Sequence, residues 1–163
     1  MAKLLKIKTK GFDTLQDTLR ARFERGVMNP AQKSIVESSD DLAFVAQEMA
    51  PRKTGTLESA IEPITNPTRS GATVSGGVRV RGTAYNPIDK KRVAQYRVEA
   101  HEEITPAGNK RLGPGSVQKN ASILGKFDGV GVGGWFMTRA LQYMQDKIIN
   151  QLKNAIRMGL SRS

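Results

Sequence analysis

Two glycine patterns in this sequence have the spacing of phosphate-binding loops. Gly129, Gly131 and Gly134 satisfy G-x-G-x-x-G shortly before a predicted helix. That arrangement binds a dinucleotide when the helix leads into a strand with an acidic residue about 20 positions further on. Here the helical pattern runs to the last residues and supplies no such strand. A Walker loop is also excluded, because Gly125-Lys126 is followed by Phe and not by Ser or Thr. We therefore expect a flexible hinge before the last helix and no bound cofactor.

The only histidine, His101, lies among Glu99, Glu102 and Glu103. An imidazole in such surroundings could act as a general base oriented by a carboxylate, or could ligate a metal. A transition-metal site needs further His or Cys ligands, and the chain has no cysteine. The lack of cysteine also excludes disulfides and thiolate chemistry, and no serine stands in a G-x-S-x-G elbow. We expect a surface or interface role for His101, no metal and no enzymatic activity.

The strong positive charge points to a polyanionic partner or to a well-solvated surface. The formal net charge is +11, from 26 Lys and Arg against 15 Asp and Glu. Aromatic residues make up only 6% of the chain, too few for a base-stacking platform, and no sequence-reading module is visible. The densest basic clusters are the candidates for contact with an acidic neighbour or with DNA: Lys90, Lys91, Arg92, Lys110 and Arg111.

The length of 163 residues is most economically a single domain, 1–163. No apolar run approaches the ~20 residues needed to span a bilayer. The first residues show no signal-peptide core, so we expect synthesis in the cytoplasm and no membrane contact.

The first third of the chain predicts one strand and two helices. Alternation over residues 4–10 predicts a half-buried strand. From residue 12 the period becomes helical, with Phe12, Leu15, Leu19 and Phe23 on one face. "GVMNP", residues 26–30, is expected to break that helix, and Asn29-Pro30 to begin the next. The second helix is expected to stop at Pro51, with "SSDD" at 38–41 as a point where it could kink or divide. Its predicted buried stripe is Ile35, Leu42, Val45 and Met49.

The remainder predicts two strand segments, a long loop and a last helix. Residues 57–65 indicate a strand or a short helix leading into a strand, and residues 72–82 a strand with Gly76-Gly77 as a bulge or turn. The Gly- and Pro-rich stretch 105–134 is expected to be a loop that orders on assembly, with a short strand near 123–127. The last helix begins near Trp135, and its predicted apolar stripe is Met137, Leu141, Met144, Ile148, Leu152 and Ile156.

"PRKTG", residues 51–55, is basic but has a structural explanation. Pro51 stops the helix, Gly55 supplies a positive φ angle, and Leu57 returns to the core. Thr54 completes the turn. We therefore expect a corner and not a phosphate cradle.

Three motifs in this order resemble the small tail-completion or head–tail joining proteins of long-tailed bacteriophages. That family shows a P-x-x-T-G-x-L turn after a long helix, a Tyr-x-x-x-Glu-x-Gly segment, and a "P-F-(L/M)-x-x-A" entry to the last helix. The matching segments are "APRKTGTL" at 50–57, "YRVEAHE" at 96–102 and "GGWFMTRAL" at 133–141. Three departures stand out: the spacing from Tyr96 to Glu99 is tighter than in the family, so this segment matches only in part, His101 replaces the preferred Gly, and Trp135 replaces the usual Pro. The individual matches are Pro51, Thr54, Gly55 and Leu57, then Tyr96 and Glu99, then Phe136, Met137 and Ala140.

The resemblance implies an α+β fold, in which a small, mostly antiparallel sheet packs against a long N-terminal helical region and a C-terminal amphipathic helix. It implies a structural virion protein of the neck or tail end, which forms a ring, expected to be a hexamer, that completes the tail and joins it to the head-side connector. The implied partners are other copies of the chain, neck or connector proteins, a tail terminator or tail tube protein, and DNA passing through the lumen. The stripe of the last helix could cover the subunit's own sheet or a neighbour. The alternative function is a basic nucleic-acid-associated module without catalysis.

Overall fold

The computed structural model describes residues 12–52, 55–83, 85–86, 91–92 and 114–162. These form helices and small antiparallel sheets, so the fold is α+β, as expected. The predicted strand at 4–10 lies outside the described residues.

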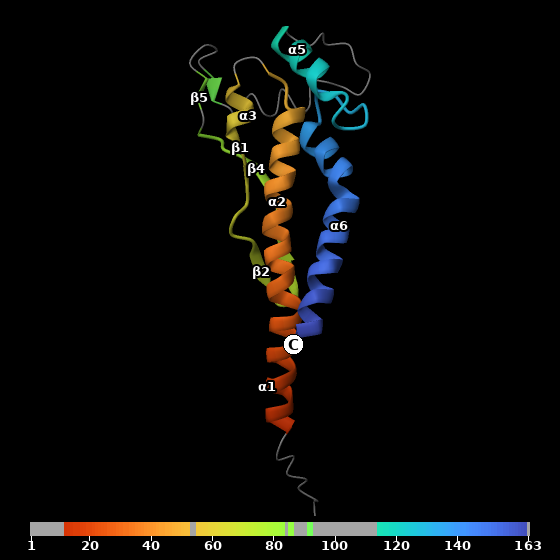
Figure 1. The fold of residues 1–163 in the computed structure, drawn as a ribbon. Coiled ribbons are helices and arrows are strands. Elements are labelled where there is room, and N and C mark those ends of the chain that lie inside the picture. Colours follow the sequence, from red (N-terminus) through yellow and green to blue (C-terminus); the bar gives the residue numbers. More distant parts are fainter. Residues whose placement is uncertain (1–11, 53–54, 84, 87–90, 93–113, 163) are drawn as a thin grey trace, which may run out of the picture.

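One long helical rod forms the first part of the molecule. It consists of α1 (Phe12–Phe23), a π-helical turn η1 (Glu24–Met28) and α2 (Asn29–Met49). Figure 1 shows α1 continuing the line of α2. The predicted break at "GVMNP" is therefore wrong. Proline in a helix interior loses one backbone hydrogen bond and clashes with the carbonyl four residues earlier. The wider π turn relieves that clash at Pro30, and the N–H of Asn29 bonds to the carbonyl of Glu24.

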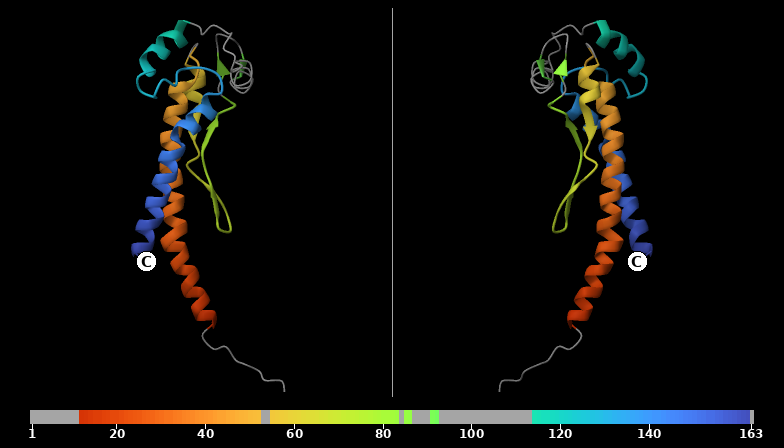
Figure 2. Two further views of the ribbon diagram at one scale, coloured as in Figure 1. Left: turned by 90° about the vertical axis from the view of Figure 1, so that its right-hand side faces the viewer. Right: turned by 90° about the vertical axis from the view of Figure 1, so that its left-hand side faces the viewer.

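The second long helix, α6 (Phe136–Arg162), lies alongside α2 (Figures 1 and 2). Near the C-terminal end of α2 the contact is apolar, and it becomes polar further along. There Ser38 Oγ donates to Gln151 Oε1 at 2.9 Å, and Lys147 Nζ lies 2.9 Å from Asp41 Oδ2. The hydrogen bond from Lys147, assisted by Gln151, lowers the pKa of the Asp41 carboxyl. The "SSDD" segment neither kinks nor divides α2, and two of its side chains, Ser38 and Asp41, bind α6.

Within the described residues the strands form three two-stranded antiparallel sheets. After the short helix α3 (Thr56–Ala60) come β1 (Ile61–Pro63), β2 (Thr68–Ser70), β3 (Thr73–Ser75) and β4 (Val78–Val80). Strand β1 pairs with β4 and β2 with β3, which makes one interrupted hairpin that extends along α2 in Figure 2. Strands β5 (Tyr85–Asn86) and β6 (Lys91–Arg92) form the third pair. The predicted helix-to-strand passage and the Gly76-Gly77 interruption are confirmed.

The core lies where the end of α2 meets α3, β1, β4 and the start of α6. The sequence correctly assigned Leu42, Val45 and Met49 to it. The remaining large side chains in this cluster come from elements far apart in the chain: Leu57, Ile61, Val80, Ile123, Phe127, Val132, Phe136 and Met144.

The stretch predicted as a loop contains a helix, α5 (Pro114–Ile123), and the predicted strand near 123–127 is absent, because residues 124–129 form turns. Proline is tolerated in a first helical turn. The buried side of α5 consists of Ser116, Lys119 and Ile123. Two of these three residues are polar, so apolar periodicity gave no sign of a helix. Residues 105–113 lie outside the described part.

Two predicted apolar stripes differ from the observed burial. On α1, Leu15, Leu19 and Phe23 are 53%, 58% and 44% exposed. On α6 the face against α2 is centred on Phe136, Ala140 and Met144, which leaves Leu141 50% exposed. The predicted stripe on α6 is therefore confirmed at Met144, which is buried, and at Met137 and Ile148, which pack against the core, but not at Leu141.

The π turn also fits closely against α6. A Cβ on Gly159 would overlap the carbonyl oxygen of Gly26 and the ring of Pro30. A glycine-to-alanine change in a helix ordinarily stabilises by about 1 kcal/mol. At this crossing the two backbones would have to separate, an overpacking cost of about 1–3 kcal/mol.

We predict that Gly159→Ala lowers the free energy of unfolding, against the usual helical trend. Urea unfolding followed by circular dichroism measures the change. Gly125→Ala is the control, because a Cβ at that position would have no atom within 4 Å, and it should change stability little. A Gly159→Ala protein more stable than its parent would contradict the close crossing.

Candidate functional site

The turn after α2 has the form that the sequence predicts for a structural corner. Ala50 ends α2 in an extended conformation and is fully buried. Gly55 has φ of 81° just before α3, and Leu57 is 4% exposed in the core. Pro51 is half-buried, and Thr54 lies outside the described residues. The predicted positive φ at Gly55 is confirmed.

Helix α5 binds the backbone at the start of this turn. The N–H of Arg52 donates to Ser116 Oγ at 2.8 Å, and the same hydroxyl donates to the carbonyl of Arg52 at 3.2 Å. A Cβ on Gly115 would lie 2.9 Å from that carbonyl oxygen, so the helix approaches closely. Because the N–H of Arg52 is already bonded within the chain, it is not presented to a phosphate.

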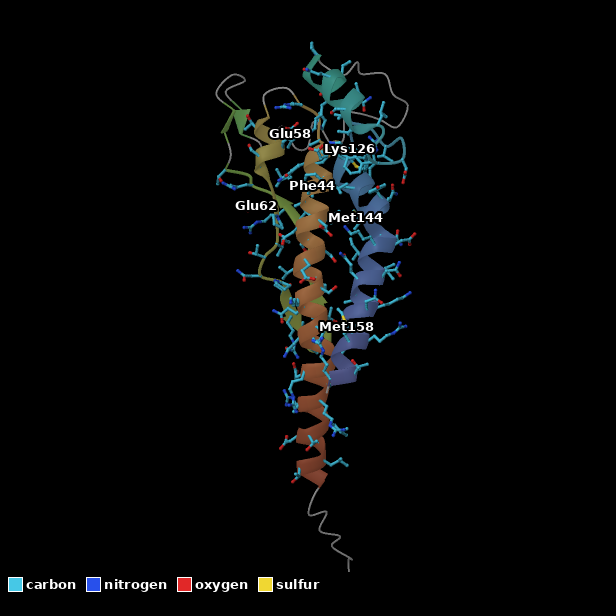
Figure 3. The ribbon with its side chains drawn as sticks, viewed as in Figure 1. Phe44, Glu58, Glu62, Lys126, Met144 and Met158 are labelled. Carbon is cyan, nitrogen blue, oxygen red and sulfur yellow. The ribbon has the colours of Figure 1, made fainter. Side chains whose placement is uncertain are left out.

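A buried lysine lies beside the same corner. The side chain of Lys119 is 8% exposed, and its ammonium donates to the carbonyls of Gln47 at 2.6 Å and Ala50 at 3.1 Å. It also donates to Glu58 Oε1 at 2.6 Å. The last carbonyls of a helix have no partner within the helix, so Lys119 completes the end of α2 and links it to α3. Figure 3 shows Glu58 on α3 at this end of the molecule.

The arrangement around Lys119 suits structure and not catalysis. An ammonium has three N–H donors, and three acceptors surround this one. A lysine acting as a nucleophile or base must lose a proton and reach a substrate. Here all three protons are engaged by the protein itself. A neighbouring cation, Arg52, lies 3.8 Å from the other oxygen of Glu58 and reinforces the same link.

The G-x-G-x-x-G segment is packed, so the predicted flexible hinge is wrong. Residues 131–134 are buried. The N–H of Val132 donates to Asn120 Oδ1 at 2.7 Å, and the N–H of Gly133 to the carbonyl of Met49 at 3.1 Å. A Cβ on Gly131 would overlap the Asn120 amide. These glycines let the chain pass close to α5 and to the end of α2.

The entry to α6 explains one departure from the phage motif. Phe136 and Ala140 are fully buried. Trp135 just before them has φ of 57°. Proline is restricted to φ near −65°, so the Pro of the family pattern would not fit this backbone. Trp135 therefore replaces the family's Pro at a point where the backbone has a positive φ that Pro cannot adopt.

The predicted basic contact residues are largely outside the described part of the chain. Lys91 and Arg92 form β6 opposite Asn86 and Tyr85, and only their backbone is described. Lys90, Lys110 and Arg111 lie outside the described residues, as do Tyr96, Glu99 and His101.

The described residues do form a basic groove elsewhere, between the start of α2 and the end of α6. It has a volume of about 610 Å³. Three cations line it, Arg25, Lys33 and Arg162, against one carboxylate, Glu37. Lys33 lies 3.9 Å from Glu37 and is 80% exposed, so this charge is well solvated.

Comparison with known proteins adds no relationship. No protein-family model, curated protein or solved structure matches the chain. Within the described part, no three His, Asp or Glu residues lie close enough to hold a metal ion. None of its helices is long and apolar enough to cross a membrane.

The sequence predicted the turn at residues 51–55 but not the side chains of α5 that stabilise it. Ser116, Lys119 and Asn120 occur in a segment rich in Gly, Pro, Asn and Ser, where no periodicity marks a helix. Ser116 and Lys119 bind residues more than 60 positions earlier, as in the bonds from Lys119 to Gln47 and Glu58, and Asn120 binds Val132, twelve positions later. The only local indication was Glu58 in the first turn of α3, where acidic residues are favoured.

We predict that Lys119→Met destabilises the fold strongly. Removing one partner of a buried charge pair costs about 3–5 kcal/mol, because the other charge and the helix carbonyls lose their donor. Thermal and urea unfolding measure the loss. Lys126→Met is the matched control, since Lys126 is exposed in the turn after α5 (Figure 3) and should change stability by about 0.5 kcal/mol or less. Equal stability of the two variants would contradict the role given to Lys119.

We also predict that Gly55→Val lowers stability by about 1–2 kcal/mol through backbone strain alone. No atom lies within 4 Å of a Cβ at this position, so a Cβ itself overlaps no neighbour. Gly55→Asn should cost less, because Asn is several-fold enriched in the left-handed region. Urea unfolding of both variants tests the order. A Val variant as stable as the parent would show that the corner does not require glycine.

Proposed function

We propose that this chain is a structural subunit of a long-tailed phage virion, which forms a ring at the neck or tail end. In this role it completes the tail and joins it to the head-side connector. The first support is the ordered set of three motifs. Two of them, around Pro51 and Phe136, meet at the end of α2 and serve internal packing. Their residues need no substrate to explain their types or positions.

The observation that carries the proposal is the exposed apolar side of α1. Three large side chains, Leu15, Leu19 and Phe23, repeat every fourth residue and are each at least 44% exposed. They stand on a helix that extends beyond the rest of the fold (Figures 1 and 2). Contiguous exposed apolar surface of this kind is typical of a protein–protein contact site. A subunit that functions by assembly requires such a surface, whereas a freely diffusing monomer gains nothing from it.

The proposal includes a closed ring, a hexamer by the resemblance, with neck or connector proteins on one side and a tail terminator or tail tube protein on the other. In this arrangement the chain is made in the host cytoplasm and ends in the virion. The net charge of +11 suits an acidic neighbouring ring or DNA passing through the lumen.

The basic groove supports a second candidate, a nucleic-acid-associated module without catalysis. Arg25, Lys33 and Arg162 would attract phosphates without reading sequence. Binding of this kind weakens steeply as salt rises, in proportion to the phosphates contacted. Fluorescence anisotropy with a short duplex between 50 and 300 mM salt therefore separates this candidate from a purely structural subunit.

Deletion of the gene from its phage tests the first proposal. We expect filled heads and tails that fail to join stably, or tails with faulty ends, when the lysate is viewed by negative-stain electron microscopy. A plasmid copy of the gene should restore infectious particles. Normal infectious virions from the deletion would contradict the proposal.

A further inference from the structure

Helix α1 has one apolar side that no described part of its own fold covers. Leu15, Leu19 and Phe23 lie at i, i+4 and i+8, so they share one face of the helix. The figures show α1 projecting past the C-terminal end of α6, which runs only alongside α2 and η1. The exposure of these three residues follows from this geometry.

Helix α6 has a second apolar side, next to the one it packs against α2. At 100° per residue, Leu141, Ile149, Leu152 and Ile156 fall within one sector of less than a third of the circumference. Leu141 and Ile149 are 50% and 39% exposed, and Leu152 and Ile156 are half-buried. The other residues of this sector, Thr138, Gln142 and Gln145, are uncharged. We call this sector the outer face of α6.

The charged residues of α6 lie elsewhere on the helix. Lys147 is paired with Asp41 of α2. By the same helical geometry Arg139, Asp146 and Arg157 lie between the outer face and the α2 contact, and Lys153 adjoins the edge of the outer face at Gln142. The helix therefore separates an uncharged outer face, running over about four turns, from its charged side.

We propose that α1 of one copy of this chain packs its apolar side against the outer face of α6 of the next copy. The outer face is long enough to cover the apolar side of α1: Leu15 to Phe23 rises about 12 Å, and Leu141 to Ile156 rises about 22 Å. Within one chain they do not meet, because α1 continues the line of α2 away from α6. In an assembly of several copies, the apolar side of α1 contacts the outer face of α6 in one neighbouring copy, and the outer face contacts α1 of the other neighbour.

This contact deepens the proposed ring, on which it rests. Because the two surfaces are different, the contact is head-to-tail, and repeating it generates a ring when the rotation closes. It also follows from the charge. Copies that each carry +11 repel one another, so contact is favoured where both surfaces lack charge. Salt screens this repulsion, so self-association should strengthen with salt, opposite to binding of DNA.

Two single-face variants test the contact, by sedimentation velocity at 0.1 and 0.5 M NaCl. Leu19→Glu places a charge in the apolar side of α1, and Ile149→Glu places the same charge in the outer face of α6. We expect the parent to form one closed oligomer, and each variant alone to be monomeric or at least tenfold weaker in association. Mixed together, the variants should form a 1:1 heterodimer and nothing larger, because only one intact α1 and one intact outer face remain.

The controls place the same charge on the opposite sides of the helices. Ala21→Glu on α1 and Asn150→Glu on α6 are exposed positions away from the two apolar sides and should assemble like the parent. Equal melting curves for all four variants, recorded at a concentration where the parent is dissociated, show that the subunit fold is intact, since each replaced residue is exposed.

Several outcomes overturn this inference, and they differ from failure of the proposed function. A parent that stays monomeric at both salt concentrations, or variants that assemble as the parent does, would exclude the contact. Assembly lost only with Leu19→Glu, and not restored by mixing, would indicate packing of α1 against α1. In each of these cases the gene-deletion phenotype still decides whether the chain is a neck or tail subunit.

Discussion

The buried ammonium of Lys119 is the interaction on which the rest of this structure depends. Helix α2 ends inside the protein, where its last carbonyls need donors. Lys119 supplies them at Gln47 and Ala50, and its contact with Glu58 balances the charge. One side chain thus connects α5 to the ends of two other helices. The corner at Gly55, the buried Gly131 segment and the entry to α6 are all arranged around this connection.

From that end the molecule becomes progressively less apolar. The core gives way to a polar contact between α2 and α6 through Ser38, Asp41 and Gln151. Beyond it the two helices cross closely at Gly26 and Gly159, and α1 then continues alone with its apolar side exposed. One end of the protein is thus stabilised by its own contacts, and the apolar side of α1 at the other end is covered by no described residue. The proposed function rests on this difference between the two ends.

Local rules predicted those elements whose signals are local. The buried stripe of α2, its stop at Pro51, the positive φ at Gly55 and the Gly76-Gly77 interruption all follow from side-chain periodicity or backbone sterics. Helix α5 was missed because its buried side contains Ser116 and Lys119, whose partners lie far away in sequence. The break expected at Pro30 was wrong, because a π turn accommodates the ring. Leu141 was assigned to the buried side, because periodicity identifies an apolar sector but not which part of it a neighbouring helix covers.

Hydrogen exchange of the purified protein, followed by mass spectrometry at two concentrations, tests this account most directly. At low concentration, where subunits are separate, amides of α5 and the C-terminal half of α2 should be strongly protected and those of α1 should exchange fast. At high concentration the amides of α1 should gain protection while α5 stays unchanged. Strong protection of α1 in the dilute protein, or exchange of α5 as fast as that of α1, would contradict the division into a self-contained end and an assembling end.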